Sequence, residues 1–187
     1  EVRVSDKEEV YHSLIPEEIV KELALSKAEN VADDLREKQE QVKQISFDKK
    51  NNVLLDTIVI GADTIVVSDG SILGKPKDEA DAVRMIRSLQ GRSHKVYTGV
   101  AILDYDDEGK RKSVVHAVET EVFVNPMSDE EIREYAATGE PLDKAGAYGI
   151  QGQFAAYIER IDGDYYNVVG LPVSYVYRQL KEIAEKD

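Results

Sequence analysis

The most strand-like stretch of the chain is residues 57–67, which read Thr-Ile-Val-Ile-Gly-Ala-Asp-Thr-Ile-Val-Val. Their β-branched side chains favour a strand, which a glycine, an alanine and an aspartate interrupt. Residues 68–71 then have the composition of a turn, and Ile72 and Leu73 follow as a short return strand. The stretch therefore predicts a hairpin whose first strand carries a carboxylate, Asp63.

Helices and further strands are expected on both sides of this hairpin. Each expected helix begins at a proline or a capping side chain, and the four helices cover residues 16–31, 78–90, 128–139 and 173–185. The remaining strands are expected at residues 94–103, 114–124, 155–161 and 165–169. This order mixes hairpins with helices. The expected fold class is therefore α/β, with a mixed β-sheet and flanking helices rather than a doubly wound parallel sheet.

The stretch from Asp33 to Asn52 consists mostly of charged and amide residues with few apolar anchors. It either extends the first helix or forms a solvated excursion, and we assign it no catalytic chemistry. A different class of function, an acidic interaction module that uses residues 33–52, remains open on this observation.

The composition excludes several classes of protein. The 187 residues are 42% hydrophobic, which suffices for one globular domain over residues 1–187. Lys and Arg number 24 against 37 Asp and Glu, so the net charge of −13 opposes a polyanion and no nucleic-acid partner is expected. The sequence has no apolar run of about 18 residues and no signal-peptide pattern, which predicts a cytoplasmic protein without a membrane partner. Because cysteine is absent, any metal must bind oxygen or imidazole.

Asp63 is the most informative carboxylate in the chain. It follows a run of β-branched residues, where a strand interior normally rejects a charge, and its small neighbours Gly61 and Ala62 leave room for a ligand. It either satisfies a turn at the strand end, accepts a proton from an attacking water, or holds a metal that binds phosphates. The sequence alone leaves these roles open.

Two lysines are candidates for binding phosphate. Lys75 lies in Leu-Gly-Lys-Pro, where glycine permits close approach and proline fixes the exit direction. Lys27 lies in the first helix beside its apolar stripe, where a snorkelling side chain is the alternative. Asp78 is better explained as a helix cap, and His94, on a strand of Val, Thr and Ile residues, as a buried core residue.

A glycine-rich loop at residues 143–152 combines a carboxylate, a cation and an amide with small residues, which favours a binding loop over a structural one. Its candidate ligands are Lys144 and Gln151. The Gln151 amide offers both a donor and an acceptor, a pattern complementary to the imide edge of uracil or thymine. We expect Asp63 and the lysines to face Gln151 across one shared hollow.

Together these segments resemble the Maf proteins, a family of nucleotide pyrophosphatases distantly similar to inosine triphosphate pyrophosphatases. The resemblance covers most of the chain in the same order and is most specific at residues 143–152. Its pieces are Glu17-Glu18 through Lys27-Ala28, Gly61-Ala62-Asp63-Thr64, Leu73-Gly74-Lys75-Pro76, Gly91-Arg92-Ser93-His94 through Thr98, Gly139-Glu140-Pro141 through Gly152, and Gly163-Asp164-Tyr165 through Gly170-Leu171-Pro172. The resemblance implies a two-lobed fold with a central cleft.

The resemblance also implies an activity and site residues. The activity is cleavage of a nucleoside triphosphate between its α- and β-phosphates, dependent on Mg²⁺ or Mn²⁺, by a homodimer. Asp63 matches the position treated as proton acceptor, and Lys27 and Lys75 match lysines on the phosphate side. Thr64 and Gln151 match positions linked to substrate choice. Thr64 resembles the branch acting on dTTP, UTP and related pyrimidines, whereas the branch acting on 7-methyl-GTP has glutamine there.

The start of the chain departs from the family pattern. Family members begin with a strand and a Ser-x-Ser-Pro-Arg-Arg loop, and Glu1 to Glu9 resembles the segment that follows them. We therefore expect this chain to lack that strand and loop. Glu8 or Glu9 then matches a metal-side acid, together with Asp63. A nucleotide-binding regulator without turnover, linked to septum formation in cell division, is the alternative function.

Overall fold

The computed structural model describes residues 1–5, 9–45, 57–106 and 108–185, with only the backbone described for residues 39–45. The chain forms two compact units, the first made of Glu1–Asp63 with Gly99–Ala117 and the second of Thr64–Thr98 with Val118–Asp187. Among the described helices, none combines the length and the apolarity that a bilayer span requires. The α/β class with a helix-flanked sheet is confirmed.

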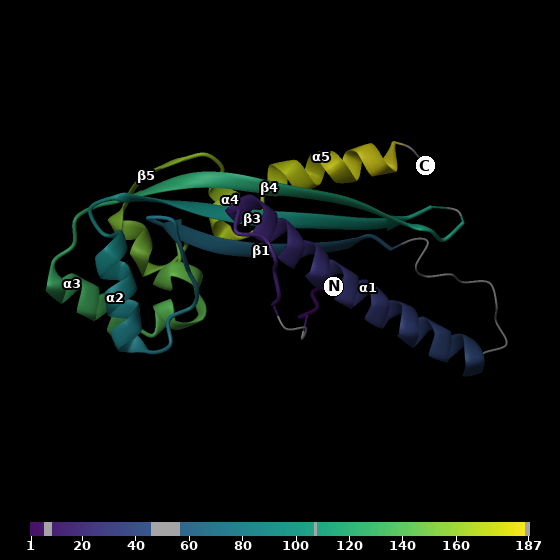
Figure 1. The fold of residues 1–187 in the computed structure, drawn as a ribbon, viewed down its shortest axis with the longest axis horizontal. Coiled ribbons are helices and arrows are strands. Elements are labelled where there is room, and N and C mark those ends of the chain that lie inside the picture. The colour runs from purple at the N-terminus through teal and green to yellow at the C-terminus, as the bar shows by residue number, and fades with distance from the viewer. Residues whose placement is uncertain (6–8, 46–56, 107, 186–187) are drawn as a thin grey trace. The chain divides into compact units, whose positions relative to one another are not determined.

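Figure 1 shows the described helices and strands. The helices are α1 (Pro16–Ile45), α2 (Glu79–Leu89), α3 (Asp129–Ala137), α4 (Tyr165–Val169) and α5 (Val173–Ala184). The strands are β1 (Val59–Ser68), β2 (Ser71–Leu73), β3 (Ser93–Tyr105), β4 (Arg111–Val124) and β5 (Ile158–Asp162). Three short 3₁₀ helices are η1 (Glu140–Asp143), η2 (Ala145–Ala147) and η3 (Gln153–Tyr157). The sheet order is β2-β1-β3-β4-β5, and the β1–β2 and β4–β5 pairs are antiparallel.

Helix α1 packs in the first unit through small side chains. Ala24, Ala28 and Ala32 are fully buried against a cluster that includes Val59 and Leu103. Gly61 makes this close approach possible, because a Cβ atom there would lie 2.8 Å from the Ala28 amide nitrogen. The helix extends into the stretch from Asp33 to Asn52 as far as Ile45, and the rest of that stretch lies outside the described residues.

The second unit has the larger core, formed where α2 and α3 lie side by side (Figure 1). Ile86 and Leu89 of α2 and Ile132 of α3 are fully buried there, together with Phe154. Both expected helix starts are confirmed. Asp78 accepts a hydrogen bond from the Asp81 amide, and Ser128 forms a reciprocal capping box with Glu131.

Two predictions near the C-terminal end are wrong. Residues 155–157 belong to the 3₁₀ helix η3, so strand β5 begins only at Ile158. Tyr165–Val169, expected as a return strand, is the helix α4. The Asp164 side chain caps its start by accepting from the Tyr166 amide at 2.8 Å, and Gly170 ends it with a positive φ of 117°. Local capping outweighs the β-propensity of this short apolar run.

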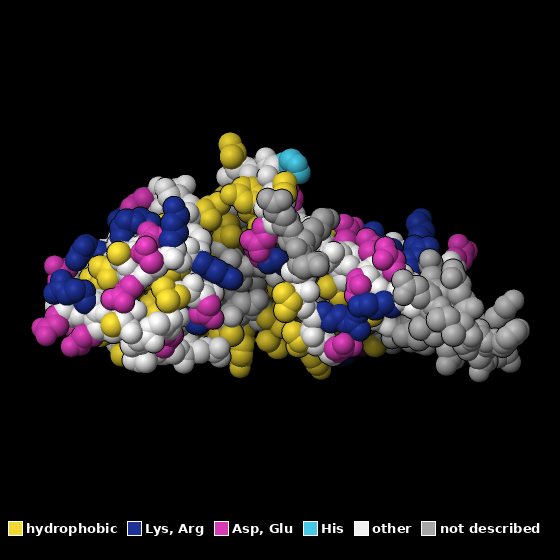
Figure 2. All heavy atoms as spheres, turned by 90° about the horizontal axis from the view of Figure 1, so that it is seen from below, with side chains coloured by type: hydrophobic (Ala, Val, Ile, Leu, Met, Phe, Trp, Pro, Cys, Tyr) yellow, Lys and Arg dark blue, Asp and Glu magenta, His cyan; other side chains and the backbone are white. Residues whose placement is uncertain are grey.

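The surface carries both signs of charge. Figure 2 shows acidic and basic side chains interspersed over the described surface that it draws. Exposed pairs in the second unit illustrate this, because Arg87 bonds Asp129 and Arg92 bonds Asp69, each at 2.7 Å.

Candidate active site

A cavity of about 270 Å³ in the second unit brings together four of the predicted substrate-binding residues. These are Thr64, Lys75, Lys144 and Gln151. The remaining lining is largely apolar, and it comprises Val66, Val96, Ala145, Tyr148, Gly149, Ile150, Gly152, Val168 and Val169. A mostly apolar hollow with a few polar groups is the usual form of a small-molecule site.

The cationic side of the cavity is assembled by backbone contacts between two segments. Lys75 follows Gly74 at the end of β2, and Lys144 lies between η1 and η2. The Gly146 amide donates to the Gly74 carbonyl at 3.0 Å, which ties these two segments together. Gly146 has a φ of +70°, which side chains rarely adopt, and a Cβ atom there would lie 3.0 Å from the Val66 side chain. Both the backbone conformation and the space therefore favour glycine.

Glu140, which the sequence analysis did not single out, anchors the loop that carries Gln151. Its carboxylate accepts from the Tyr135 hydroxyl at 3.0 Å and from the Gln153 amide at 3.0 Å. Burial and the neighbouring Glu140 raise the pKa of Tyr135, so its hydroxyl keeps the proton that it donates. A side chain at Gly152 would collide with the Glu140 carboxylate. The sequence held one signal, because Glu140 lies in the Gly-Glu-Pro segment of the family resemblance.

A series of buried, hydrogen-bonded polar groups supports the cavity wall behind Thr64, and no sequence pattern predicts it. The Thr64 and Thr98 hydroxyl oxygens lie 2.8 Å apart, and the Thr98 hydroxyl donates to the main-chain carbonyl of Asn167 at 2.8 Å. The Asn167 side chain is fully buried, and its amide nitrogen donates to the Val96 carbonyl at 3.1 Å and to the Thr120 hydroxyl at 2.9 Å. These bonds fix α4 against the strands that carry Thr64 and Thr98.

His94 is a buried core residue, as expected. Its Nε2 atom lies 2.7 Å from the hydroxyl of Tyr148, which lines the cavity. Burial lowers the pKa of His94 to about 4, so the imidazole is neutral at pH 7. His94 therefore supports the cavity wall without contributing charge.

In the first unit, Lys27 joins the two carboxylates expected on the metal side. Its ammonium group donates to the Asp63 carboxylate and lies 2.8 Å from the Glu9 carboxylate. Burial acts to lower the pKa of Lys27, but the hydrogen bonds to Asp63 and Glu9 outweigh it and raise the pKa above its usual value. Lys27 is therefore a fixed positive charge between two acids.

The chemistry of this carboxylate pair fits part of a divalent metal site. Mg²⁺ binds oxygen ligands and is commonly held by one or two carboxylates together with substrate phosphates and waters. Asp63 and Glu9 already converge on one cation, the Lys27 ammonium. In the described part of the chain, no group of three or more His, Asp or Glu residues is arranged to hold a metal. Glu8, the other candidate acid, lies outside the described residues.

The predicted site residues thus fall into two sets. Lys27, Asp63 and Glu9 come together in the first unit. Thr64, Lys75, Lys144 and Gln151 come together in the second, so the expected shared hollow between Asp63 and Gln151 stays a prediction.

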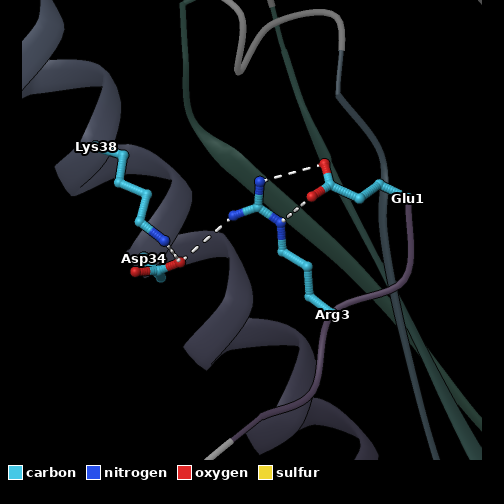
Figure 3. Close-up of polar contacts among 4 residues, drawn as sticks. All are labelled: Glu1, Arg3, Asp34 and Lys38. Atoms are coloured by element: carbon cyan, nitrogen blue, oxygen red, sulfur yellow. Dashed lines mark hydrogen bonds and ion pairs between the residues drawn. The ribbon is translucent and has the colours of Figure 1, made fainter.

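A second hollow, about 720 Å³, lies in the first unit between the N-terminal segment and α1. Four of its charged side chains form ion pairs with one another, as Figure 3 shows. Arg3 pairs with Glu1 at 3.2 Å and with Asp34 at 3.4 Å, and Asp34 accepts from Lys38 at 2.7 Å. We assign this hollow no catalytic role.

Comparison with known proteins identifies the family. A family model described as Maf-like protein matches residues 1–183. The chain belongs to the Maf family.

Curated Maf relatives are similar over most of their length. A dTTP/UTP pyrophosphatase of Dictyoglomus turgidum is 47% identical over 158 residues, which cover 84% of this chain and 70% of the relative. One of Alkaliphilus metalliredigens is 47% identical over 174 residues, 92% of this chain and 79% of the relative. One of Clostridium botulinum strain Eklund 17B is 45% identical over 177 residues, 95% of this chain and 83% of the relative.

Proposed function

We propose that this Maf protein hydrolyses dTTP and UTP to the nucleoside monophosphate and pyrophosphate. The observation that carries the proposal is the similarity to relatives named dTTP/UTP pyrophosphatase, which are 43% to 47% identical over most of the chain. The cavity of the second unit supports it, because it combines two lysines, an amide and a hydroxyl on an otherwise apolar surface.

In this proposal, Gln151 and Thr64 read the base. A uracil or thymine ring presents a carbonyl, an N–H and a second carbonyl along its imide edge. The Gln151 amide nitrogen donates to one carbonyl, the Thr64 oxygen accepts from the N–H, and the surrounding valines pack on the ring faces. Glu140 contributes indirectly, because its carboxylate accepts from the Gln153 main-chain amide and so holds the loop in place.

Lys75 and Lys144 bind the phosphate side of the substrate. The chain has a net charge of −13, so a polyphosphate needs placed cations to offset long-range repulsion. Both lysines line the cavity, and the Gly146–Gly74 bond fixes the spacing of their segments. Lys27 supplies a third positive charge on the phosphate side.

Asp63 acts as proton acceptor for the attacking water. Its side chain is only 9% exposed, and the bond to Lys27 holds the carboxylate in one orientation. A bound Mg²⁺ or Mn²⁺, held by Asp63 and Glu9, would neutralise charge on the phosphate oxygens. We further propose that the protein is a cytoplasmic homodimer.

The test is a nucleotide panel on the full-length protein. dTTP, UTP, CTP, dATP and GTP are incubated with Mg²⁺ or Mn²⁺, and products are separated by ³¹P NMR. We expect monophosphate and pyrophosphate from dTTP and UTP first, and loss of turnover with EDTA. Release of single phosphates would contradict the proposal. Binding of dTTP without any product would favour the regulator alternative.

A further inference from the structure

We propose that Thr98 is a positioning residue that makes the Thr64 hydroxyl a pure hydrogen-bond acceptor toward the cavity. Thr98 is fully buried and does not line the cavity, whereas Thr64 does. The inference rests on the proposed function, because it concerns how the same cavity distinguishes one pyrimidine from another.

The positions of the two hydroxyl protons follow from the donors and acceptors of the buried polar residues. Thr98 has one hydroxyl proton, and the Asn167 carbonyl 2.8 Å away can only accept. That proton therefore lies between Thr98 and Asn167. The 2.8 Å bond between the two hydroxyls must then use the proton of Thr64. Thr64 is left with lone pairs and no proton for a ligand.

The acceptor carbonyl itself is fixed. Asn167 is fully buried, and its main-chain carbonyl also accepts from the Gly170 main-chain amide at 3.0 Å. Its side-chain amide is held by the Val96 carbonyl and by Thr120, whose hydroxyl in turn accepts from the Asp164 amide at 3.0 Å. Because Thr98, Asn167 and Thr120 are buried and the Asn167 main-chain carbonyl can only accept, the direction of the Thr98 proton has little freedom to reverse.

An acceptor-only hydroxyl distinguishes the two pyrimidines at ring position 3. Uracil and thymine carry an N–H there, which can donate to the Thr64 oxygen. Cytosine carries a bare nitrogen there, whose lone pair would face the Thr64 lone pairs. A site that leaves a buried acceptor unpaired rejects the wrong ligand. The buried polar residues thus act as a device that favours uracil over cytosine.

The test compares wild type, Thr98→Val and Thr98→Ser in the full-length protein. Valine has nearly the shape of threonine without the hydroxyl, so the Thr64 proton becomes free to point into the cavity. Serine keeps the hydroxyl and serves as the conservative control. Binding of UMP and CMP is measured by calorimetry, which does not depend on turnover, and melting temperatures report folding.

We expect wild type and Thr98→Ser to bind UMP more tightly than CMP by similar ratios, and Thr98→Val to narrow that ratio by about five- to tenfold. An unchanged ratio in Thr98→Val, equal losses for both nucleotides, or no UMP preference in wild type would overturn the inference. Failure of the proposed function has a different signature: no pyrophosphate release from wild type, whatever the UMP to CMP ratio.

Discussion

The Lys27 ammonium group donates a hydrogen bond to the Asp63 carboxylate, across 36 residues of sequence. Asp63 is nearly buried, with 9% of its side chain exposed, and Glu9 approaches the same ammonium at 2.8 Å. Lys27 is thus the counter-ion of two acids, and its removal takes away the positive charge that both carboxylates contact.

Lys27→Met should therefore lower the free energy of unfolding by about 2 kcal/mol at neutral pH. The pKa of Lys27 is raised on folding, so the stability from its charge is complete below pH 10.5 and is lost as the pH rises through the folded pKa. Urea unfolding at pH 7.5 and above pH 10.5 measures this. Lys21→Met is the control and should change little, because Lys21 pairs with Glu18 within one turn of the same helix. Equal stability of both variants at pH 7.5 would contradict the pairing.

Gln151→Leu should damage base choice more than phosphate binding. The variant loses the amide that faces the imide edge, so KM for dTTP and UTP should rise about tenfold while inhibition by pyrophosphate changes little. Gln153→Leu is the matched control, because Gln153 lies two residues further along the chain and does not line the cavity. A uniform loss for all nucleotides and for pyrophosphate would show that Gln151 only shapes the loop.

His94→Gln should flatten the acid dependence of stability. Burial lowers the pKa of His94 to about 4, so the folded state resists protonation of the ring. The contribution of neutral His94 to the free energy of unfolding is complete above pH 6.5. It is lost as the pH falls from 6.5 to about 4, which lowers the free energy of unfolding by about 3 kcal/mol. Urea midpoints across this range should fall less in the variant, whose amide can still bond Tyr148. Parallel profiles would remove His94 from this role.

Gly61→Ala should destabilise the protein by more than about 2 kcal/mol, because the added Cβ would meet the backbone of α1 at Ala28. Gly74→Ala is the control, since a Cβ there has no atom within 4 Å. Thermal unfolding compares the two. A wild-type melting temperature for Gly61→Ala would mean that α1 does not pack this closely on β1.

The sequence predicted those elements whose signals are local. Asp78 and the Ser128–Glu131 pair mark their helices because a cap acts within one turn. The same kind of cap, Asp164, begins α4, yet the short run that follows it also fits a strand, because β-propensity and helix propensity compete over five residues.

The site was predictable only where chemistry and composition coincide. Lys144 and Gln151 are polar residues in a glycine-rich loop, a pattern that predicts ligand-binding residues. The cavity brings them together with Thr64 and Lys75. Thr98 could not be found, because its importance depends on Asn167, 69 residues away, and on burial. Such relations arise from tertiary packing, which periodicity does not encode.

We propose that Asp63 accepts the proton of the water that attacks dTTP or UTP. The most direct measurement is kcat for pyrophosphate release from dTTP by wild type and Asp63→Asn, with dTTP binding measured alongside. Asp69→Asn is the control, because Asn tolerates the positive φ of 49° at that exposed turn. We expect kcat to fall by about 10²- to 10⁴-fold in Asp63→Asn while dTTP binding is kept, and we expect Asp69→Asn to stay active. An Asp63→Asn variant with the wild-type kcat would contradict it.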